Sequence, residues 1–288
     1  ARAPLPLPVN ASLANNRASF DTSLTSLAGV NNSPVDVWLE GHLARFADDT
    51  SQSGRFGVVY VGADRLLNPH LLIGIMAQYD WMKQRYGNTP LGTPIDANAT
   101  AEITGTGWMV GPYITARRQE NLYFDGRVAG GRSENKITPF GTFEDRFDTE
   151  RWLMSAALTG EFVWPSSRGN DHWTIRPGMA FQYIVEDQPS YLDSLGVTIP
   201  GSTISQGDLR LGPRVGYTHR RENGTILNPW LEVEAVYGFT ASGDDFSQGG
   251  FAHHTDGLSA SLEAGINLQT TNGLPLAASA QDDGIGAD

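Results

Sequence analysis

A carboxylate followed directly by an imidazole, at Asp171 and His172, is one pattern in this chain that could support chemistry. Such a pair can act in hydrolysis when a nucleophile lies close by, and none accompanies it in the short connection where we place it. His253 and His254 could ligate a metal ion, but adjacent strand residues point apart and no further ligand is spaced around them. No Gly-x-Ser-x-Gly elbow or phosphate loop is present. We therefore expect no enzyme activity, no metal site and no cofactor.

Acidic residues and arginines also recur at alternate positions of otherwise apolar segments. In extended strands they would point away from the aliphatic and aromatic side chains. They could line a hydrated channel, or they could form ion pairs that fix strand register. Both interpretations place them on an inward face, because a lipid-facing Arg costs about 2–4 kcal/mol at the middle of a bilayer. The predicted pore-lining residues are Asp125, Arg127, Glu161, Arg176, Arg210, Arg214, Glu232, Glu234 and Glu263.

The elements that would position these charges have a period of two. From Trp152 to Trp164 every second residue is apolar or Gly, and the residues between them include Ser155, Thr159 and Glu161. A strand needs about 9–11 residues to span a bilayer, and aromatic residues mark both interfaces. A soluble sandwich would also alternate, but its strands usually run about five or six residues. The long alternating segments therefore favour a transmembrane barrel.

Connection lengths provide an independent indication. We predict strands near 35–47, 54–66, 70–83, 101–117, 121–132, 149–164, 172–186, 204–219, 227–239, 257–270 and 274–284. The even-numbered connections are short, and the third, fifth, seventh and ninth are longer, as in outer-membrane barrels with tight periplasmic turns. Pro112, Pro177 and Pro213 fall inside predicted strands, where we expect irregular pairing because Pro lacks an N–H donor.

Residues 1–34 differ from the rest. The alternating prolines at residues 4–8 indicate an extended linker. Leu13, Phe20, Leu24 and Leu27 then recur at helical spacing. This predicts either a helix over residues 12–29, which could occupy the barrel lumen, or a disordered linker.

Composition narrows the class of protein. The 288 residues include 33 Gly and no Cys, with a net charge of −12 and aromatic residues at 10%. The acidic balance argues against nucleic acid as a partner. No stretch of about 18 apolar residues could form a transmembrane helix, and the mean hydropathy of −0.29 is compatible with a barrel whose apolar residues occupy alternate positions.

Several segments resemble a known family. The run Val35–Gly41, the run Gly62–Leu66 followed by Leu72–Ile75, Arg176–Gly178 with Tyr183, and Leu211–Gly216 are similar, in order and spacing, to the translocator domain of Gram-negative autotransporters. The resemblance covers about residues 35–284. It implies an all-β, antiparallel up-and-down barrel of about 12 strands in the outer membrane, surrounded by lipid. Its implied function is to anchor an N-terminal passenger and export it to the cell surface by type V secretion.

The resemblance also implies partners. They are the protein's own passenger and the barrel assembly machinery of the outer membrane, which in this family recognises a final strand that ends on an aromatic residue. This sequence ends at Asp288, so we expect that the twelfth strand is missing from it, which would leave a gap between the first and eleventh strands. Asn15-Asn16 and Asn31-Asn32 resemble the Asn pair at which some family members cleave themselves.

Two alternatives remain at this point. A stand-alone outer-membrane channel or a barrel adhesin would have the same strand pattern without a passenger. A soluble ligand-binding β-barrel or sandwich would also alternate, but it would need no detergent for purification.

Overall fold

In the computed structural model, the described residues are 9–14, 17–23, 34–47, 52–86, 101–138, 143–167, 171–242, 257–271 and 275–285. They form antiparallel strands joined by turns and irregular connections. Within them, no helix is long and apolar enough to cross a bilayer. The strands are β1 (Val9–Ala14), β2 (Arg17–Ser23), β3 (Asp36–Ala47), β4 (Gln52–Asn68), β5 (Leu71–Tyr86), β6 (Ala101–Gln119), β7 (Leu122–Thr138), β8 (Asp145–Gly160), β9 (Phe162–Pro165), β10 (His172–Gln188), β11 (Tyr191–Leu192), β12 (Thr198–Ile199), β13 (Ser202–Arg220), β14 (Ile226–Ser242), β15 (Gly257–Gln269) and β16 (Pro275–Ile285).

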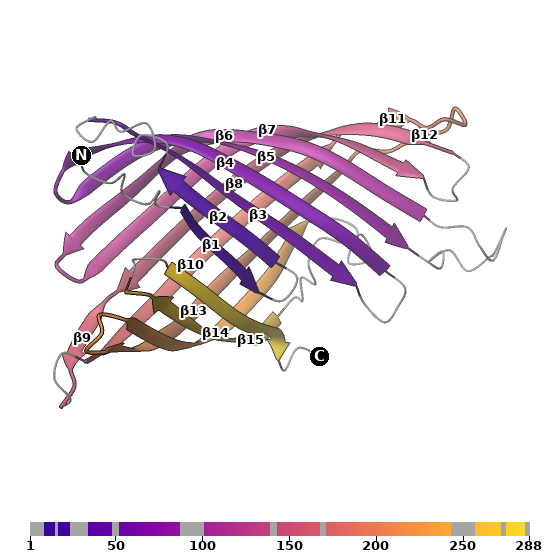
Figure 1. Cartoon of the computed structure of the whole chain (residues 1–288). Helices are drawn as coiled ribbons and strands as arrows, with labels where there is room; N and C mark the ends of the chain where they lie inside the picture. Colours follow the sequence, from indigo (N-terminus) through magenta and orange to yellow (C-terminus); the bar gives the residue numbers. More distant parts are fainter. Residues whose placement is uncertain are drawn as a thin grey trace, which may run out of the picture.

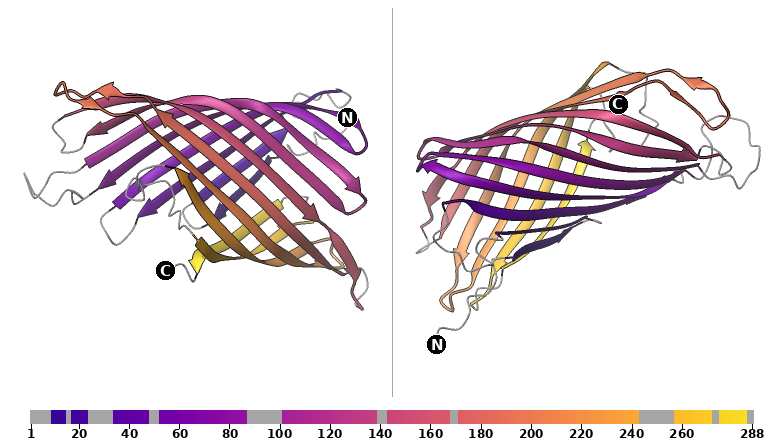
Figure 2. Two further views of the ribbon diagram at one scale, coloured as in Figure 1. Left: turned by 180° about the vertical axis from the view of Figure 1, so that it is seen from behind. Right: turned by 90° about the horizontal axis from the view of Figure 1, so that it is seen from above.

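One sheet contains every strand except β11 and β12, which pair with each other. The strands lie in the sheet in chain order, β1 to β8 and then β10, β13, β14, β15 and β16, and β9 continues the line of β8 along β10 (Figure 1). The sheet coils strongly, so that its early and late strands cross at a large angle in the view from above (Figure 2). β1 lies beside β16. No backbone ladder joins those two strands within the described residues.

The described strands correspond to all eleven segments expected from the alternation, with β8 and β9 together forming the sixth. Tight turns join β4 to β5 at Pro69-His70 and β6 to β7 at Glu120-Asn121. At the other end of the sheet, β10 and β13 are separated by a longer excursion that contains the β11–β12 hairpin. The two ends of the sheet thus differ in connection length, as expected for an outer-membrane barrel.

The prolines inside strands interrupt single ladders. The β6–β7 ladder skips from Val110 to Tyr113, across Pro112, and resumes in the same register. The β13–β14 ladder skips in the same way across Pro213. Pro177 faces the break between β8 and β9. The expected irregularity is therefore present as local gaps without a register shift, because Pro removes one donor and leaves the strand direction unchanged.

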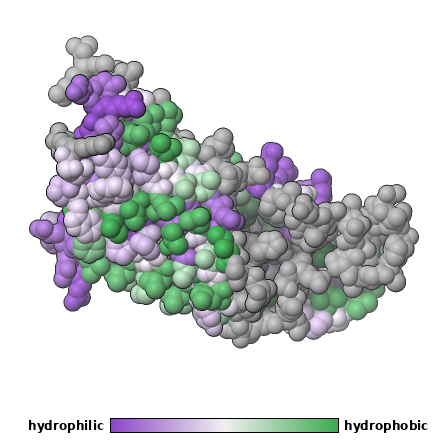
Figure 3. Space-filling model, turned by 90° about the horizontal axis from the view of Figure 1, so that it is seen from below, coloured by the Kyte–Doolittle hydropathy of each residue, from purple (hydrophilic) through white to green (hydrophobic). Residues whose placement is uncertain are grey.

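Burial in this sheet is inverted relative to a soluble protein. Trp108, Trp152 and Met179 are about half exposed, whereas Arg151, Thr149 and Ser133 are buried. Figure 3 shows apolar residues gathered in bands over the face in view. The sheet therefore turns its apolar side chains outward and its polar side chains inward, the arrangement expected in lipid.

Outward aromatic residues occur at two levels along the β8–β9 line. Trp164, Trp173 and Tyr217 occupy directly opposed positions of β9, β10 and β13 near the short turns. Trp152 lies in the middle part of β8, farther from those turns. Trp164 lies twelve positions after Trp152, which corresponds to about 40 Å along a strand and about 28 Å across a bilayer at a tilt of about 45°. This distance matches an apolar band of about 25 Å.

The helix expected over residues 12–29 is replaced, in the described part of that segment, by strands. Residues Val9–Ala14 and Arg17–Ser23 form a hairpin, and the second of these strands pairs with β3 from Arg17 opposite Ala44 to Ser23 opposite Trp38. The backbone groups on the free side of β3 need partners in a bilayer, and β2 supplies them. Residues 24–29 lie outside the described part, and so do the Asn15-Asn16 and Asn31-Asn32 pairs.

Candidate functional site

The nine predicted charges lie on the polar side of the sheet. Register places Arg176 opposite Arg214, Arg214 opposite Glu232, and Glu232 opposite Glu263. Residues directly opposed in a ladder point to the same face. The charges of β10, β13, β14 and β15 therefore form one continuous group, and the outward positions between them carry Leu209, Leu211, Leu231, Val233 and Leu262.

Arg214 is the centre of this group. Its Nε donates to Glu232 Oε2 at 2.9 Å, and its Nη2 lies within 3.9 Å of Glu263 Oε2. The guanidinium also lies 3.9 Å from the centroid of the Trp230 ring. The two opposed carboxylates of Glu232 and Glu263 thus share one cation, which offsets their mutual repulsion.

Two further arginines have separate carboxylate partners. Arg210 donates to Asp208 at 2.6 Å and approaches Glu234 at 3.8 Å. Arg176 donates to Glu161 at 2.6 Å, and Glu161 follows directly after the end of β8. Each of these ion pairs joins side chains of one strand or of neighbouring strands, and all are partly exposed.

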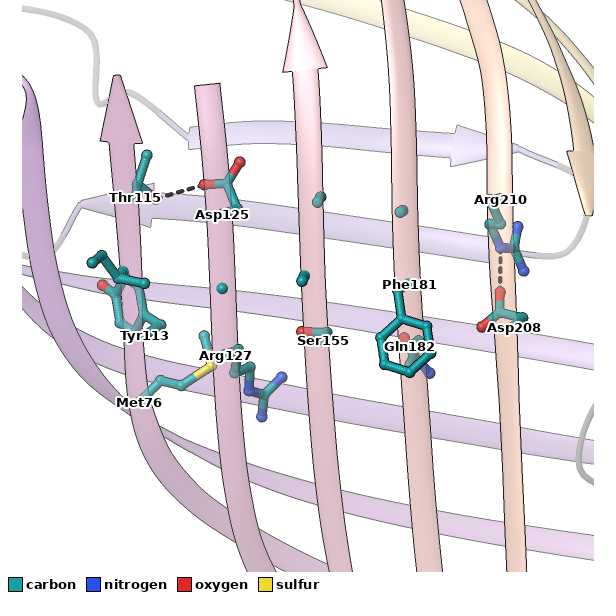
Figure 4. A pocket seen from close by; sticks show the side chains of 15 residues that line it. Met76, Tyr113, Thr115, Asp125, Arg127, Ser155, Phe181, Gln182, Asp208 and Arg210 are labelled. Carbon is teal, nitrogen blue, oxygen red and sulfur yellow. Dashed lines mark hydrogen bonds and ion pairs between the residues drawn. The ribbon is translucent and has the colours of Figure 1, made fainter. Parts of the chain in front are cut away.

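Asp125 and Arg127, which the sequence placed together on β7, have different partners. Asp125 accepts a hydrogen bond from Thr115 on β6 at 2.6 Å. Arg127 donates to Gln78 at 3.0 Å, and its guanidinium lies 5.5 Å from the Tyr60 ring centroid. Both border a hollow of about 260 Å³ on the inner face, which Gln182, Asp208 and Arg210 also line (Figure 4).

Two buried charges on the strands, Arg151 and Asp80, were not among the predicted residues. Arg151 of β8 donates to both carboxylate oxygens of Asp80 of β5, at 2.8 and 3.1 Å, and both side chains are less than 10% exposed. On its other side Arg151 approaches Glu186 of β10 at 3.7 Å. Ser133 and Thr149 donate to Glu186 as well, so that one polar network extends from β5 to β10.

Gly107 of β6 makes room for this network. A Cβ at that position would lie 2.3 Å from Arg151 Nη1 and 3.1 Å from Asp80 Oδ1. The Arg151 side chain can therefore lie across two intervening strands to reach β5. The alternation that places Trp152 outward also places Arg151 inward, so the inward position of Arg151 could have been predicted, whereas its partner depends on the register of three ladders.

A smaller inward cluster lies nearer the short turns. Trp38 of β3 donates from its indole nitrogen to the hydroxyl of Tyr113 at 2.7 Å, and that hydroxyl donates to Asp64 of β4. The Tyr113 ring lies over Gly74, where a Cβ would be 2.4 Å from its Cζ. These contacts join β3, β4, β5 and β6 on the inner face.

Asp171 lies in the connection before β10 and is buried. It accepts hydrogen bonds from the hydroxyl of Tyr217 at 2.8 Å and from the backbone amide of Arg220 at 3.1 Å, and His219 Nδ1 lies 2.8 Å from it. The hydrogen bond with His219, followed by that from the Arg220 amide, lowers the pKa of Asp171 to about 2. Asp171 therefore joins this connection to the end of β13, and its partners are not those of a dyad with His172.

No cluster of three or more metal-ligating side chains occurs in the part of the chain that the structure describes. His253 and His254 lie outside that part.

Comparison with known proteins decides the family. The profile of the autotransporter beta-domain matches residues 37–281. The chain belongs to the autotransporter β-domain family. It is similar to the β domain of the Bordetella autotransporter BrkA, at 17% identity and a TM-score of 0.61, over 87% of this chain and 92% of that chain. It is also similar to the transport unit of AIDA-I from Escherichia coli, at 13% identity and a TM-score of 0.54, over 83% of this chain and 80% of that one. At these identities the structural likeness supports the fold alone.

The family assigns a location and a role to the inverted sheet. This autotransporter β domain is an antiparallel β-barrel of the outer membrane of a Gram-negative bacterium. Its role is that of a translocator, which anchors a linked passenger and exports it to the cell surface. Autotransporter translocator domains are not themselves enzymes, and the polar inner face is the part of the fold that such a role requires.

Proposed function

We propose that the inner-face charges of this autotransporter β domain line the path of the passenger through the outer membrane. The observation that supports this proposal is the division of the strands into two faces. The nine charges, from Asp125 to Glu263, occupy the face opposite to Trp152, Met179 and Leu211.

Ion pairing within the wall suits such a path. An isolated charge in the wall would attract counter-charges of the passing chain, whereas Arg214 is shared by Glu232 and Glu263. A wall of paired charges stays hydrated and offers no apolar surface to an unfolded peptide. The same pairs fix strand register, so both roles considered from the sequence are compatible.

A crosslinking experiment tests the path directly. The chain has no Cys, so single-cysteine variants report one position each. A passenger that is stalled by a folded reporter would carry a thiol-reactive group near its C-terminal end. We expect crosslinks to Ser155→Cys on the inner face of β8 and to Gln182→Cys, which register places opposite it on β10.

Met154→Cys provides the matched control, because it is adjacent to Ser155 and faces outward. Crosslinking at Met154→Cys as strong as at Ser155→Cys, or crosslinking at neither inner position, would contradict the proposed path. Non-stalled passenger should give weaker crosslinks at all three positions.

Family membership also supports a role for the barrel assembly machinery in inserting this domain. Insertion can be measured by the shift in electrophoretic mobility that folded barrels show before heating. Depletion of the machinery should reduce the folded fraction of this domain. The total amount of the domain is measured separately as a control. An unchanged folded fraction would exclude this partner.

We further infer that Asp171 has a structural role, because its carboxylate is occupied by Tyr217, His219 and the Arg220 amide. Asp171→Asn should leave surface display of the passenger intact. A display defect with normal barrel folding would show that Asp171 acts in export itself.

A further inference from the structure

Cationic side chains form a row on the outward face of the sheet, at the end where the long connections lie. Ladder registers place Arg45 of β3 opposite Arg55 of β4, Arg55 opposite Lys83 of β5, and Lys83 opposite Thr104 of β6. The row continues through Lys136 of β7 to Arg146 of β8. Five of these six directly opposed positions therefore carry a positive charge.

The first three members of the row lie at the margin of the apolar band. Two residues nearer the middle of the membrane, the opposed positions are Leu43, Gly57 and Trp81. The Trp81 ring lies against Gly57, where a Cβ would be 2.2 Å from Trp81 Cζ2. Because aromatic residues mark the interface of outer-membrane barrels, Arg45, Arg55 and Lys83 lie at the level of the outer-leaflet headgroups.

Most cations near this row have a carboxylate partner in the structure. Lys83 and Arg85 both contact Glu102. Lys136 and Arg146 both contact Glu144, at 3.6 and 2.7 Å. Arg45 and Arg55 differ, because neither has an ion-pair partner within the described residues, and both are exposed. Like charges at directly opposed positions repel each other, with Cβ atoms about 4.5–5.5 Å apart, so an anion at this place would remove an unfavourable interaction.

We propose that Arg45, Arg55 and Lys83 bind a phosphate group of an anionic glycolipid of the lipid A type in the outer leaflet. Two neighbouring guanidinium groups can each donate paired hydrogen bonds to one phosphate, a geometry that Arg favours. The apolar surface of Leu43 and Val61 on the same face can contact the acyl chains. A lipid is favoured over a free ion because the row borders the lipid-facing band and is directed away from the lumen.

Affinity for lipid A in detergent micelles tests this site. Arg55→Gln should weaken binding about 5-fold, and the double variant Arg45→Gln/Arg55→Gln about 25-fold, since a basic side chain at a membrane surface is worth about 1 kcal/mol, which is about 5-fold. Glutamine keeps the polar stem and removes only the charge. Heat-modifiable electrophoretic mobility would show that each variant is folded.

Arg65→Gln is the matched control, because Arg65 lies on the same outward face of β4 near the short-turn end of the strand. This variant should bind lipid A like the unaltered protein. Lipid A without its phosphates should bind the unaltered protein as weakly as lipid A binds the double variant. An excess of inorganic phosphate should compete poorly. Equal affinity of the double variant and the unaltered protein for lipid A would overturn the proposal, and so would full competition by inorganic phosphate.

Discussion

At the scale of single residues, the pattern of burial is the reverse of that in a soluble protein, because apolar side chains face outward and polar side chains face inward. Arg151 and Asp80 are the charges that a soluble core would exclude, and here they are buried in the inner wall with Ser133 and Thr149 around them. A buried ion pair of this kind adds little net stability compared with apolar packing. Removing one partner is costly, however, because the other charge stays buried.

Arg151→Met should therefore destabilise the barrel by about 3–5 kcal/mol, since it leaves the Asp80 carboxylate buried without its cation. Arg176→Met removes an inner-face arginine whose ion pair with Glu161 is partly exposed, and it should cost only about 0–1 kcal/mol. Urea unfolding in micelles, followed by tryptophan fluorescence, measures both changes. If the two variants lose the same stability, the network from β5 to β10 is not the main electrostatic constraint of the wall.

The Asp171 carboxylate predicts an acid-sensitive contribution to stability. The pKa of Asp171 is lowered to about 2 in the folded protein, chiefly by the hydrogen bond with His219. In an unfolded chain the pKa of Asp is about 3.9. The unfolded state therefore binds the proton first, so the contribution is present above about pH 4 and is lost as the pH falls toward 2. The difference in unfolding free energy between the unaltered protein and Asp171→Asn, measured from pH 6 to pH 2, should shrink over this range. A difference that stays constant with pH would be inconsistent with this pKa.

At the scale of elements, alternation and connection length were sufficient to predict eleven strand segments from β3 to β16. Both signals follow directly from lipid on one side of the sheet and water on the other. The ends of the strands were less predictable: β6 runs to Gln119 and β7 to Thr138, beyond the expected bounds. These extensions carry polar residues such as Asn135 and Lys136, which give no apolar signal. The ladders continue there because an antiparallel pair satisfies its backbone groups in any solvent.

The N-terminal segment shows where a sequence pattern can mislead. The spacing of Leu13 and Phe20 fits a helix, but β1 and β2 occupy this region as a hairpin on the β3 edge. The spacing of four apolar residues indicates only which side chains would share one face of a helix. It gives no information on the free edge of β3, with which β2 pairs. The partnership of Arg151 with Asp80 was hidden for a related reason, since it depends on residues 71 positions apart.

Close approach of neighbouring strands predicts a sharp difference between two glycines. A Cβ at Gly212 would lie 1.9 Å from the Val233 carbonyl oxygen, whereas at Gly178 the nearest atom would be 3.6 Å away. Gly212→Ala should force β13 from β14 and cost about 1–3 kcal/mol, and Gly178→Ala should change stability by less than about 1 kcal/mol. The urea midpoint of each variant in micelles measures this. Equal midpoints would mean that the interrupted ladder beside Pro213 can widen without cost.

At the scale of the whole molecule, the sequence was enough to predict which surface faces water but not how the charges of that surface are shared. Each inward position can be inferred from its outward neighbours in the strand. Glu232, for example, must face inward because Leu231 and Val233 face outward. The arrangement of Glu232 and Glu263 around Arg214 requires three strands in fixed register. The register of β13, β14 and β15 depends on the pairing of all the strands in the coiled sheet.

The net charge of the inner face leads to a prediction about the ion selectivity of the barrel. Among the described residues, acidic side chains at inward positions outnumber arginines, since β3, β4 and β5 contribute Asp36, Glu40, Asp64 and Asp80 but no arginine. A wall with a surplus of carboxylates concentrates cations. Inserted in a planar bilayer between solutions of unequal KCl concentration, the barrel should therefore show a reversal potential of cation-selective sign.

Glu232→Gln/Glu263→Gln should move that potential toward zero, because it removes the two inward carboxylates that share Arg214. Glu150→Gln, whose side chain is exposed on the outward face beside Arg132, should leave the potential unchanged and so separates lumen charge from total charge. Anion selectivity of the unaltered barrel, or equal shifts in the two variants, would mean that ions do not pass along this face. The carboxylates would then act only within the ion pairs that hold β13, β14 and β15 in register.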